Sequence, residues 1–268
     1  RVPLEEAARF GVLTVDKKYR VRSFIEKPKN PPSDLVNMGV YLFNRELLDR
    51  VLWEDHLRED SAHDFGKDIL PRLVKSKRRV IAFPFTGYWM DVGTILSYWQ
   101  AHMDMLSPTP PLKLYDRRWV IHTRTEERPP VRIPQNACVF ASMISDGCTI
   151  QENARIESSV LSPGVIVRPG AVVRESIILT DTIIESGAII ERAVIDKHVH
   201  VEGNAHVGGG IANPDIQLAV VGKNSIIPYG MIVEPGATIS TDVIASDYPG
   251  PVVKPGEFLE TKRKPYEI

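Results

Sequence analysis

Aliphatic residues recur at every sixth position in the second half of this chain. The longest run contains Ile183, Ile189, Ile195, Val201 and Val207. Shorter runs keep the same spacing: Ile144, Ile150 and Ile156; Val167 and Val173; and Ile226, Ile232 and Ile244, with Thr238 between the last two. A six-residue period fits neither an α-helix nor an ordinary strand. It is typical of hexapeptide repeats, which wind short strands into a parallel β-helix with aliphatic side chains stacked in the interior.

Glycines follow the same period. Gly164 and Gly170 lie six residues apart, and each directly follows a proline. Gly230 and Gly236 have the same six-residue spacing. Glycine adopts the positive φ values that tight turns need, so these residues predict corners between successive strands. The sequence therefore predicts a β-helix domain over residues 135–268.

The first part of the chain, residues 1–107, alternates strand-like and helical segments. The expected strands are Val12–Val15, Tyr19–Ile25, Met38–Phe43 and Val80–Phe85, and helices are predicted to begin after Asn44, Asp64 and Thr94. This alternation indicates an α/β domain, but one with too few strands to be whole. Prolines then crowd residues 108–134, which predicts a linker.

Charge and cysteine content limit the possible partners. The chain has 33 basic and 34 acidic side chains and a formal net charge of -1, which gives no electrostatic case for nucleic acid or a membrane surface. The two cysteines form no C-x-x-C motif, so neither a disulfide framework nor a thiolate zinc site is expected, and a cytoplasmic location fits. We expect a small-molecule or protein partner.

Four polar clusters in residues 1–107 could bind a ligand. Glu26 and Lys27 end a strand, where lysine can hold a phosphate and glutamate can accept sugar hydroxyls. Asn37 and Tyr41 flank a glycine, and Asp64 opens a helix. The alternatives are structural: a solvated loop at Glu26, ordinary strand ends at Asn37, and a helix cap at Asp64.

The fourth cluster contains a single carboxylate among apolar neighbours. Asp91 follows Trp89 and Met90 and precedes Val92. Such an acid is either hydrogen-bonded for structural reasons or a ligand for a hard cation such as Mg²⁺. The residues themselves leave both interpretations open.

Taken in order, these clusters form specific motifs. They are Phe24–Pro28 (FIEKP), Asn37–Phe43 (NMGVYLF), Ser61–Pro71 (SAHDFGKDILP) and Gly87–Thr94 (GYWMDVGT), ahead of hexapeptide repeats. This combination strongly resembles the glucose-1-phosphate adenylyltransferase family, also called ADP-glucose pyrophosphorylase. The resemblance implies an α/β, Rossmann-like nucleotidyltransferase domain followed by a left-handed parallel β-helix, and a homotetramer assembled through that β-helix.

The resemblance also implies a reaction: transfer of AMP from ATP to glucose 1-phosphate, giving ADP-glucose and pyrophosphate for glycogen or starch synthesis under metabolite regulation. It places the sugar phosphate against the residues Glu26, Lys27, Asn37, Tyr41, Asp64, Phe65 and Trp89. It makes Lys27 and Asp91 catalytic, with Asp91 holding Mg²⁺ together with a second aspartate. The family usually has serine at the position of Asn37.

Two further features shape the expectation for this chain. It begins at Arg1, and residues 1–110 contain no phosphate-cradling glycine loop. The resemblance places that loop and the second aspartate in an amino-terminal half. We therefore expect this chain by itself to bind ATP poorly and to be inactive.

Two alternative functions remain open. A non-catalytic regulatory subunit of the same family would use the β-helix for assembly, although the joint presence of Lys27, Asp64 and Asp91 argues against a decayed site. A hexapeptide-repeat acyltransferase would need a catalytic histidine, for which His198 and His200 are candidates. Acetyl-CoA binding separates this second alternative from the nucleotidyltransferase.

Overall fold

The chain divides into two compact units. The computed structural model describes residues 1–123, 126–209 and 217–264, and the two units are Arg1–Gly87 and Tyr88–Ile268. Helix α4 (Ile95–Met105) belongs to the second unit because it packs on the β-helix. The predicted domain boundaries near residues 107 and 134 stay predictions. No helix in the described ranges has the length and apolarity needed to cross a bilayer.

The first unit is built on a β-hairpin. Strands β1 (Gly11–Val15) and β2 (Val21–Glu26) pair antiparallel, as the sequence predicts. The helical segments are α1 (Leu4–Ala7), α2 (Arg45–His56), the π-helical turn η1 (Phe65–Ile69) and α3 (Leu70–Lys75). Asn44 caps α2 and Asp64 caps η1, each by accepting two backbone N–H bonds through its side chain, so both predicted helix starts are confirmed.

Two predicted strands of this unit do not form. Neither Met38–Phe43 nor Val80–Phe85 is a strand, and within the described chain their bridging to other segments is limited to one antiparallel bridge, between Ile81 and Arg20. The expectation was wrong because a strand needs hydrogen-bonding partners from elsewhere in the chain, and periodicity says nothing about whether these are present.

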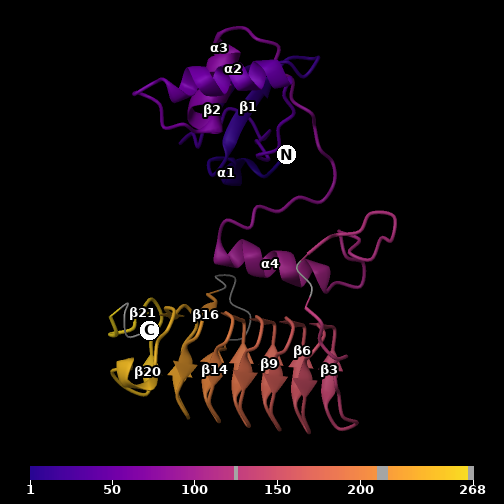
Figure 1. The fold of residues 1–268 in the computed structure, drawn as a ribbon, viewed down its shortest axis with the longest axis vertical. Coiled ribbons are helices and arrows are strands. Elements are labelled where there is room, and N and C mark those ends of the chain that lie inside the picture. The colour runs from indigo at the N-terminus through magenta and orange to yellow at the C-terminus, as the bar shows by residue number, and fades with distance from the viewer. Residues whose placement is uncertain (124–125, 210–216, 265–268) are drawn as a thin grey trace. The chain divides into compact units, whose positions relative to one another are not determined.

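The second unit is a parallel β-helix, which confirms the predicted fold class (Figure 1). Among the described residues its strands stack into three parallel sheets of seven, five and seven strands. The first contains β4 (Met143–Ile144), β7 (Val160–Leu161), β10 (Ile177–Ile178), β13 (Ala193–Ile195), β16 (Ala219–Val221), β19 (Thr238–Ile239) and β21 (Phe258–Leu259). The second contains β5 (Thr149–Ile150), β8 (Ile166–Val167), β11 (Ile183–Ile184), β14 (His200–Val201) and β17 (Ile226–Ile227). The third contains β3 (Cys138–Phe140), β6 (Arg155–Glu157), β9 (Val172–Arg174), β12 (Ile189–Glu191), β15 (His206–Gly208), β18 (Ile232–Val233) and β20 (Val252–Val253), and the 3-10 turn η2 (Ala245–Asp247) precedes β20.

The interior of the β-helix corrects the phase of the predicted repeat. Ile195 is fully buried as expected, but Ile183 and Ile189 are only partly buried, and their neighbours Ile184 and Ile190 fill the interior. Between Cys138 and Gly208, residues in register lie 17 positions apart, so one corner of each of these coils is a residue shorter than the other two. Every sixth residue after an inward-facing position therefore stops pointing inward once the chain passes that corner. Later pairs in register lie 18 to 26 positions apart.

Serine hydroxyl groups stabilise the short corner. The Ser159 hydroxyl accepts a bond from the Ser176 backbone N–H at 3.1 Å, and the Ser176 hydroxyl accepts one from Ala193 N–H at the same distance. Both serines are fully buried. The residue before each of them, Ser158 and Glu175, has a positive φ of 46° and 44°. The ladder satisfies backbone donors that this tight turn would otherwise leave unpaired.

A matched pair of substitutions tests the corrected phase. Ile190→Ala removes a fully buried side chain and is expected to lower the free energy of unfolding by about 2–5 kcal/mol. Ile189→Ala, one residue earlier on the outward face, is expected to lower it by about 1 kcal/mol or less. Denaturant unfolding of both variants measures the difference. Equal losses would show that the two side chains are not on opposite faces.

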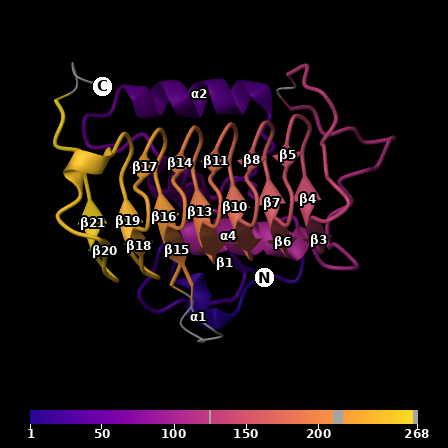
Figure 2. The same ribbon diagram turned by 90° about the horizontal axis from the view of Figure 1, so that it is seen from below.

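Helix α4 covers one face of the β-helix (Figure 2). Thr94 starts the helix with a capping box to Ser97, as predicted. Trp99 is buried against Ile177 and Val194, and its indole N–H donates to the Glu175 carbonyl at 2.6 Å. This contact joins the segment after Gly87 to the β-helix.

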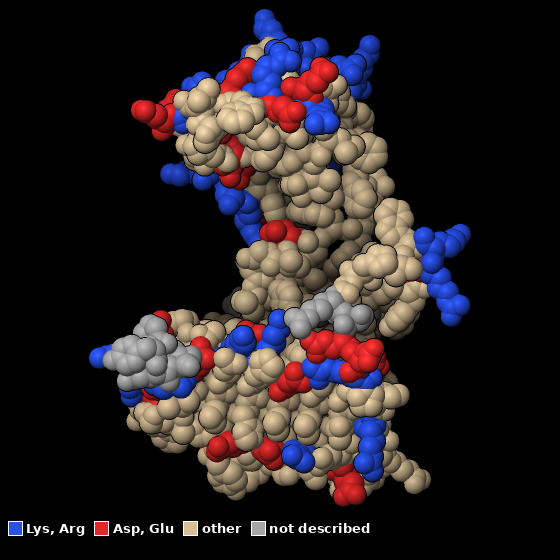
Figure 3. Space-filling view, viewed as in Figure 1, with Lys and Arg blue, Asp and Glu red and all other residues tan. Residues whose placement is uncertain are grey.

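The proline-rich linker is also attached to the β-helix. The Arg128 guanidinium donates to both carboxylate oxygens of Asp181, at 2.6 and 2.9 Å, and lowers the pKa of that carboxyl group. Acidic and basic side chains are intermixed on the β-helix face seen in Figure 3. Within the β-helix, Arg174 bridges Glu157 and Glu191 on the two adjacent strands.

Candidate functional site

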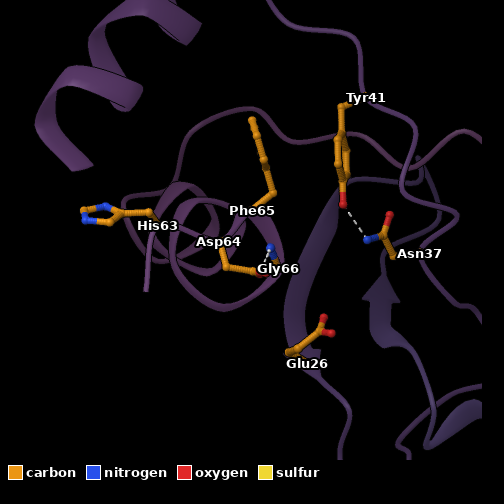
Figure 4. A pocket seen from close by; sticks show the side chains of 7 residues that line it. All are labelled: Glu26, Asn37, Tyr41, His63, Asp64, Phe65 and Gly66. Atoms are coloured by element: carbon orange, nitrogen blue, oxygen red, sulfur yellow. Dashed lines mark hydrogen bonds between the residues drawn. The ribbon is translucent and has the colours of Figure 1, made fainter. Parts of the chain in front are cut away.

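The first unit contains a cavity of about 320 Å³ (Figure 4). Seven residues from three segments line it: Glu26, Asn37, Tyr41, His63, Asp64, Phe65 and Gly66. Five of them, Glu26, Asn37, Tyr41, Asp64 and Phe65, are among the residues that the sequence motifs single out. The fold thus brings together side chains that are up to 39 positions apart in sequence, between Glu26 and Phe65.

Aromatic rings form one wall of the cavity. Tyr41 and Phe65 are stacked, with ring centroids 5.5 Å apart and planes at 16°, and Phe43 contacts both rings. The Asn37 amide donates to the Tyr41 hydroxyl at 2.6 Å, which fixes the phenol at the cavity (Figure 4). Aromatic faces beside an amide and a phenol suit a ligand with both C–H and hydroxyl surfaces.

Carboxylates form the other side. Asp64 Oδ1 accepts the backbone N–H groups of Gly66 and Lys67, both at 2.8 Å, so this oxygen is engaged in starting the helix. Glu26 projects from the end of β2 toward the same turn, where a Cβ placed on Gly66 would lie 2.6 Å from its Oε2. Because Gly66 has no side chain, there is room for the Glu26 carboxylate beside Asp64.

A buried acid missed by the sequence analysis supports this region. Asp55 is 3% exposed, accepts the Ser61 hydroxyl at 2.7 Å, lies 2.9 Å from His63 Nδ1 and forms an ion pair with Arg72. His63 has a φ of 56°, a left-handed value that these contacts maintain. The Asp55 network therefore fixes the loop that leads into Asp64. The sequence contained one signal for this role. Asp55 lies four positions after Val51, and this spacing places the acid on the apolar face of α2.

Three predicted residues lie outside the cavity lining. Lys27 follows Glu26 and is exposed, with a φ of 45° and its backbone N–H bonded to the Phe10 carbonyl. Trp89 and Asp91 are both partly buried and belong to the second unit. Their place in a common site with the cavity residues stays a prediction.

Asp91 does not form a complete metal site with its neighbours. Across the described ranges, no cluster of three or more His, Cys, Asp or Glu side chains is arranged to hold a metal ion. Mg²⁺ often takes only one or two protein carboxylates and completes its shell with water and substrate phosphates. A single carboxylate such as Asp91 fits that kind of site.

The two histidines considered for acyl transfer lie on the outside of the β-helix. His198 is exposed at a corner with a φ of 58°, and His200 Nε2 lies 3.2 Å from Glu185 Oε1. Both are partly or fully solvated polar residues of an outer face, and neither lines the cavity described above.

Comparison with known proteins gives two family matches. Residues 1–108 match the family described as Nucleotidyl transferase, and residues 131–227 match that described as GlmU-like, C-terminal hexapeptide. The two matches correspond to the α/β part and the β-helix part of the chain.

Several curated relatives share one name. A protein of Thermotoga maritima named glucose-1-phosphate adenylyltransferase is 44% identical over 267 residues, which cover 96% of this chain and 63% of the relative. Proteins of the same name from Thermosipho melanesiensis and Geobacillus stearothermophilus are 48% and 43% identical over 164 residues, 61% of this chain and 39% and 42% of the relatives. The chain thus spans less than two thirds of each of these relatives.

Proposed function

The chain is a homologue of the glucose-1-phosphate adenylyltransferases, and we propose that it provides the sugar-phosphate side of such an active site. The reaction would transfer AMP from ATP to glucose 1-phosphate, giving ADP-glucose and pyrophosphate. The relatives extend well beyond the region that this chain matches. We propose that the ATP-binding part belongs to that further region, so that the chain alone binds the sugar phosphate and does not turn it over.

The cavity lined by Tyr41, Phe65, Asn37, Glu26 and Asp64 is the observation that supports this proposal most directly. Its volume of about 320 Å³ lies at the small end of ligand sites. The stacked aromatic rings offer apolar surface for the C–H face of a hexose. The carboxylates and the amide can exchange hydrogen bonds with its hydroxyl groups.

Lys27 and Asp91 would supply the charges that the reaction needs. Attack of the sugar phosphate on the α-phosphorus of ATP brings two anions together, and in-line positioning with charge neutralisation accounts for most catalysis of this type. The Lys27 ammonium would hold the sugar phosphate as a point charge. Asp91 would hold Mg²⁺, which when bound neutralises phosphate charge as a Lewis acid.

The proposal is tested by measuring both substrates separately. Calorimetry should show glucose 1-phosphate binding to the chain, with glucose 6-phosphate as the matched control. Full-length protein that includes this sequence should form ADP-glucose and pyrophosphate from ATP and glucose 1-phosphate. ADP-glucose formation by residues 1–268 alone would contradict the division of the site proposed here.

The same measurements separate the alternatives. A regulatory subunit would give no ADP-glucose even in the full-length protein, and an acyltransferase would bind acetyl-CoA. Assembly as a homotetramer through the β-helix is part of the proposal and is measured by light scattering.

A further inference from the structure

A hydrogen bond within the second unit ties the segment that precedes α4 to the end of that helix. The Tyr88 hydroxyl donates to Asp104 Oδ2 at 2.9 Å, and both residues are partly buried. The Gln100 side-chain amide donates to the other carboxylate oxygen, Oδ1, also at 2.9 Å. The Asp104 carboxylate is thus held from two sides, which fixes the oxygen that accepts the phenol.

The phenol keeps its proton over the pH range in which an enzyme of this kind works. Burial, and next the hydrogen bond to Asp104, raise the pKa of Tyr88 to about 12. A neutral donor that faces a carboxylate forms a charge-assisted hydrogen bond, which is stronger than a bond between two neutral groups. The contact between Tyr88 and Asp104 is therefore a permanent attachment near neutral pH.

The segment 88–94 is attached to α4 at both ends. Thr94, its last residue, caps the first turn of the helix through its side chain. Tyr88, its first residue, bonds to Asp104 in the last turn. A helix rises 1.5 Å per residue, so the two attachment points lie about 14 Å apart along the axis. Asp91 is three residues from each end of the segment.

Secondary structure does not fix Asp91, which makes the two attachments important. The backbone around Asp91 is irregular, and the segment is bordered by Gly87 and contains Gly93. Glycine has more backbone freedom than any other residue, so a segment of this composition needs attachments to hold one conformation.

Helix α4 is in turn held by the β-helix. The Trp99 side chain is 5% exposed, packs on Ile177 and Val194 and donates its indole N–H to the Glu175 carbonyl. A buried aromatic ring with a satisfied N–H gives the helix one well-defined position. The β-helix therefore fixes α4, and α4 fixes the segment 88–94.

We propose that Tyr88 and Asp104 are positioning residues that hold the Asp91 carboxylate where the reaction requires it. The inference rests on the proposed function, in which Asp91 would hold Mg²⁺. A Mg²⁺ ion bound by only one or two protein carboxylates depends strongly on the placement of each. A displacement of about 1 Å in an active site can lower a rate about a hundredfold. The β-helix would thus contribute to catalysis by fixing a group outside its own coils.

The experiment removes single hydroxyl groups from full-length enzyme containing this sequence. Tyr88→Phe is expected to lower kcat about tenfold and to raise the Mg²⁺ concentration for half-maximal rate at least about threefold, because Asp91 is then less well placed. KM for glucose 1-phosphate should change by about twofold or less, since the cavity lies in the other unit. Tyr98→Phe is the matched control: it removes the same group from a partly buried tyrosine of α4 and should leave kcat and the Mg²⁺ requirement unchanged.

Asp104 gives a second test of the same bond. Asp104→Ala should lower kcat at least as much as Tyr88→Phe, and the double variant should be no worse than Asp104→Ala, since both changes remove one interaction. Asp104→Asn keeps an oxygen that can accept the phenol and should recover part of the rate. Amide hydrogen exchange, which needs no assay of the reaction, should be faster in the segment 88–94 for Tyr88→Phe and unchanged for Tyr98→Phe.

Three results would overturn the inference. They are an unchanged kcat or unchanged hydrogen exchange in Tyr88→Phe, an equal loss of kcat in Tyr98→Phe, and losses for Tyr88→Phe and Asp104→Ala that multiply in the double variant. Circular dichroism checks that each variant folds. Failure of the proposed function gives a different result: the unsubstituted full-length protein would form no ADP-glucose, and hydrogen exchange would then decide whether the Tyr88–Asp104 bond holds the segment.

Discussion

Asp91→Asn is expected to lower kcat for ADP-glucose formation by about two orders of magnitude or more in full-length enzyme containing this sequence. Asparagine keeps the shape of the side chain but replaces a charged metal ligand with a neutral one, and hard cations bind carboxylate oxygen far better. Steady-state rates at saturating ATP and glucose 1-phosphate measure the loss. Titration with Mg²⁺ should show a higher concentration requirement.

Asp146→Asn provides the control for this prediction. Asp146 is an exposed acid in the same structural unit, 55 positions after Asp91 in the sequence, and its substitution should leave kcat unchanged. If Asp91→Asn also kept its kcat and its Mg²⁺ requirement, the carboxylate would be a structural group and its proposed role in catalysis would be lost.

Lys27→Ala is expected to raise KM for glucose 1-phosphate by about tenfold to a hundredfold, and to change KM for ATP by about twofold or less. A hydrogen bond to a charged group contributes about 1.5–3 kcal/mol, which corresponds to that range. Lys27 already has a positive φ, so alanine meets the same backbone conformation and the change isolates the ammonium group. Initial rates with each substrate varied in turn measure the two KM values.

Two companion variants sharpen the Lys27 experiment. Lys29→Ala removes an exposed ammonium two residues away and should leave both KM values unchanged. Lys27→Arg keeps the charge and should restore part of the affinity for glucose 1-phosphate. An equal rise in both KM values for Lys27→Ala would assign Lys27 to general electrostatics, with no specific contact to the sugar phosphate.

Local sequence signals predicted the parts of the fold that depend on near neighbours. Asn44, Asp64 and Thr94 were each expected to cap a helix, and all three do, because a cap bonds to backbone groups two or three residues ahead. The motifs also indicated five of the seven residues that line the cavity. The β1–β2 hairpin places Glu26 and the turn at Asp64 places Phe65, but the approach of these two residues joins positions 39 apart in the sequence.

Features that depend on distant parts of the chain escaped the sequence analysis. Asp55 is an ordinary acid in the sequence of α2, and only the approach of Ser61, His63 and Arg72 makes it the buried centre of a network. The segments 38–43 and 80–85 are apolar runs of strand length, but strand pairing requires a second backbone that a local pattern cannot supply.

The aliphatic repeat was enough to predict a parallel β-helix for the second half, because stacked coils require an aliphatic residue at each inward position. Which of two adjacent isoleucines points inward, Ile189 or Ile190, is evident only from the folded coil, where Ile190 is fully buried. A coil of 17 residues has one short corner, and the length of that corner is set by the backbone register and the serine ladder between coils. The same limit applies to the cavity. The sequence motifs predicted most of its lining residues, but the contacts that hold these residues in place join positions far apart in the chain.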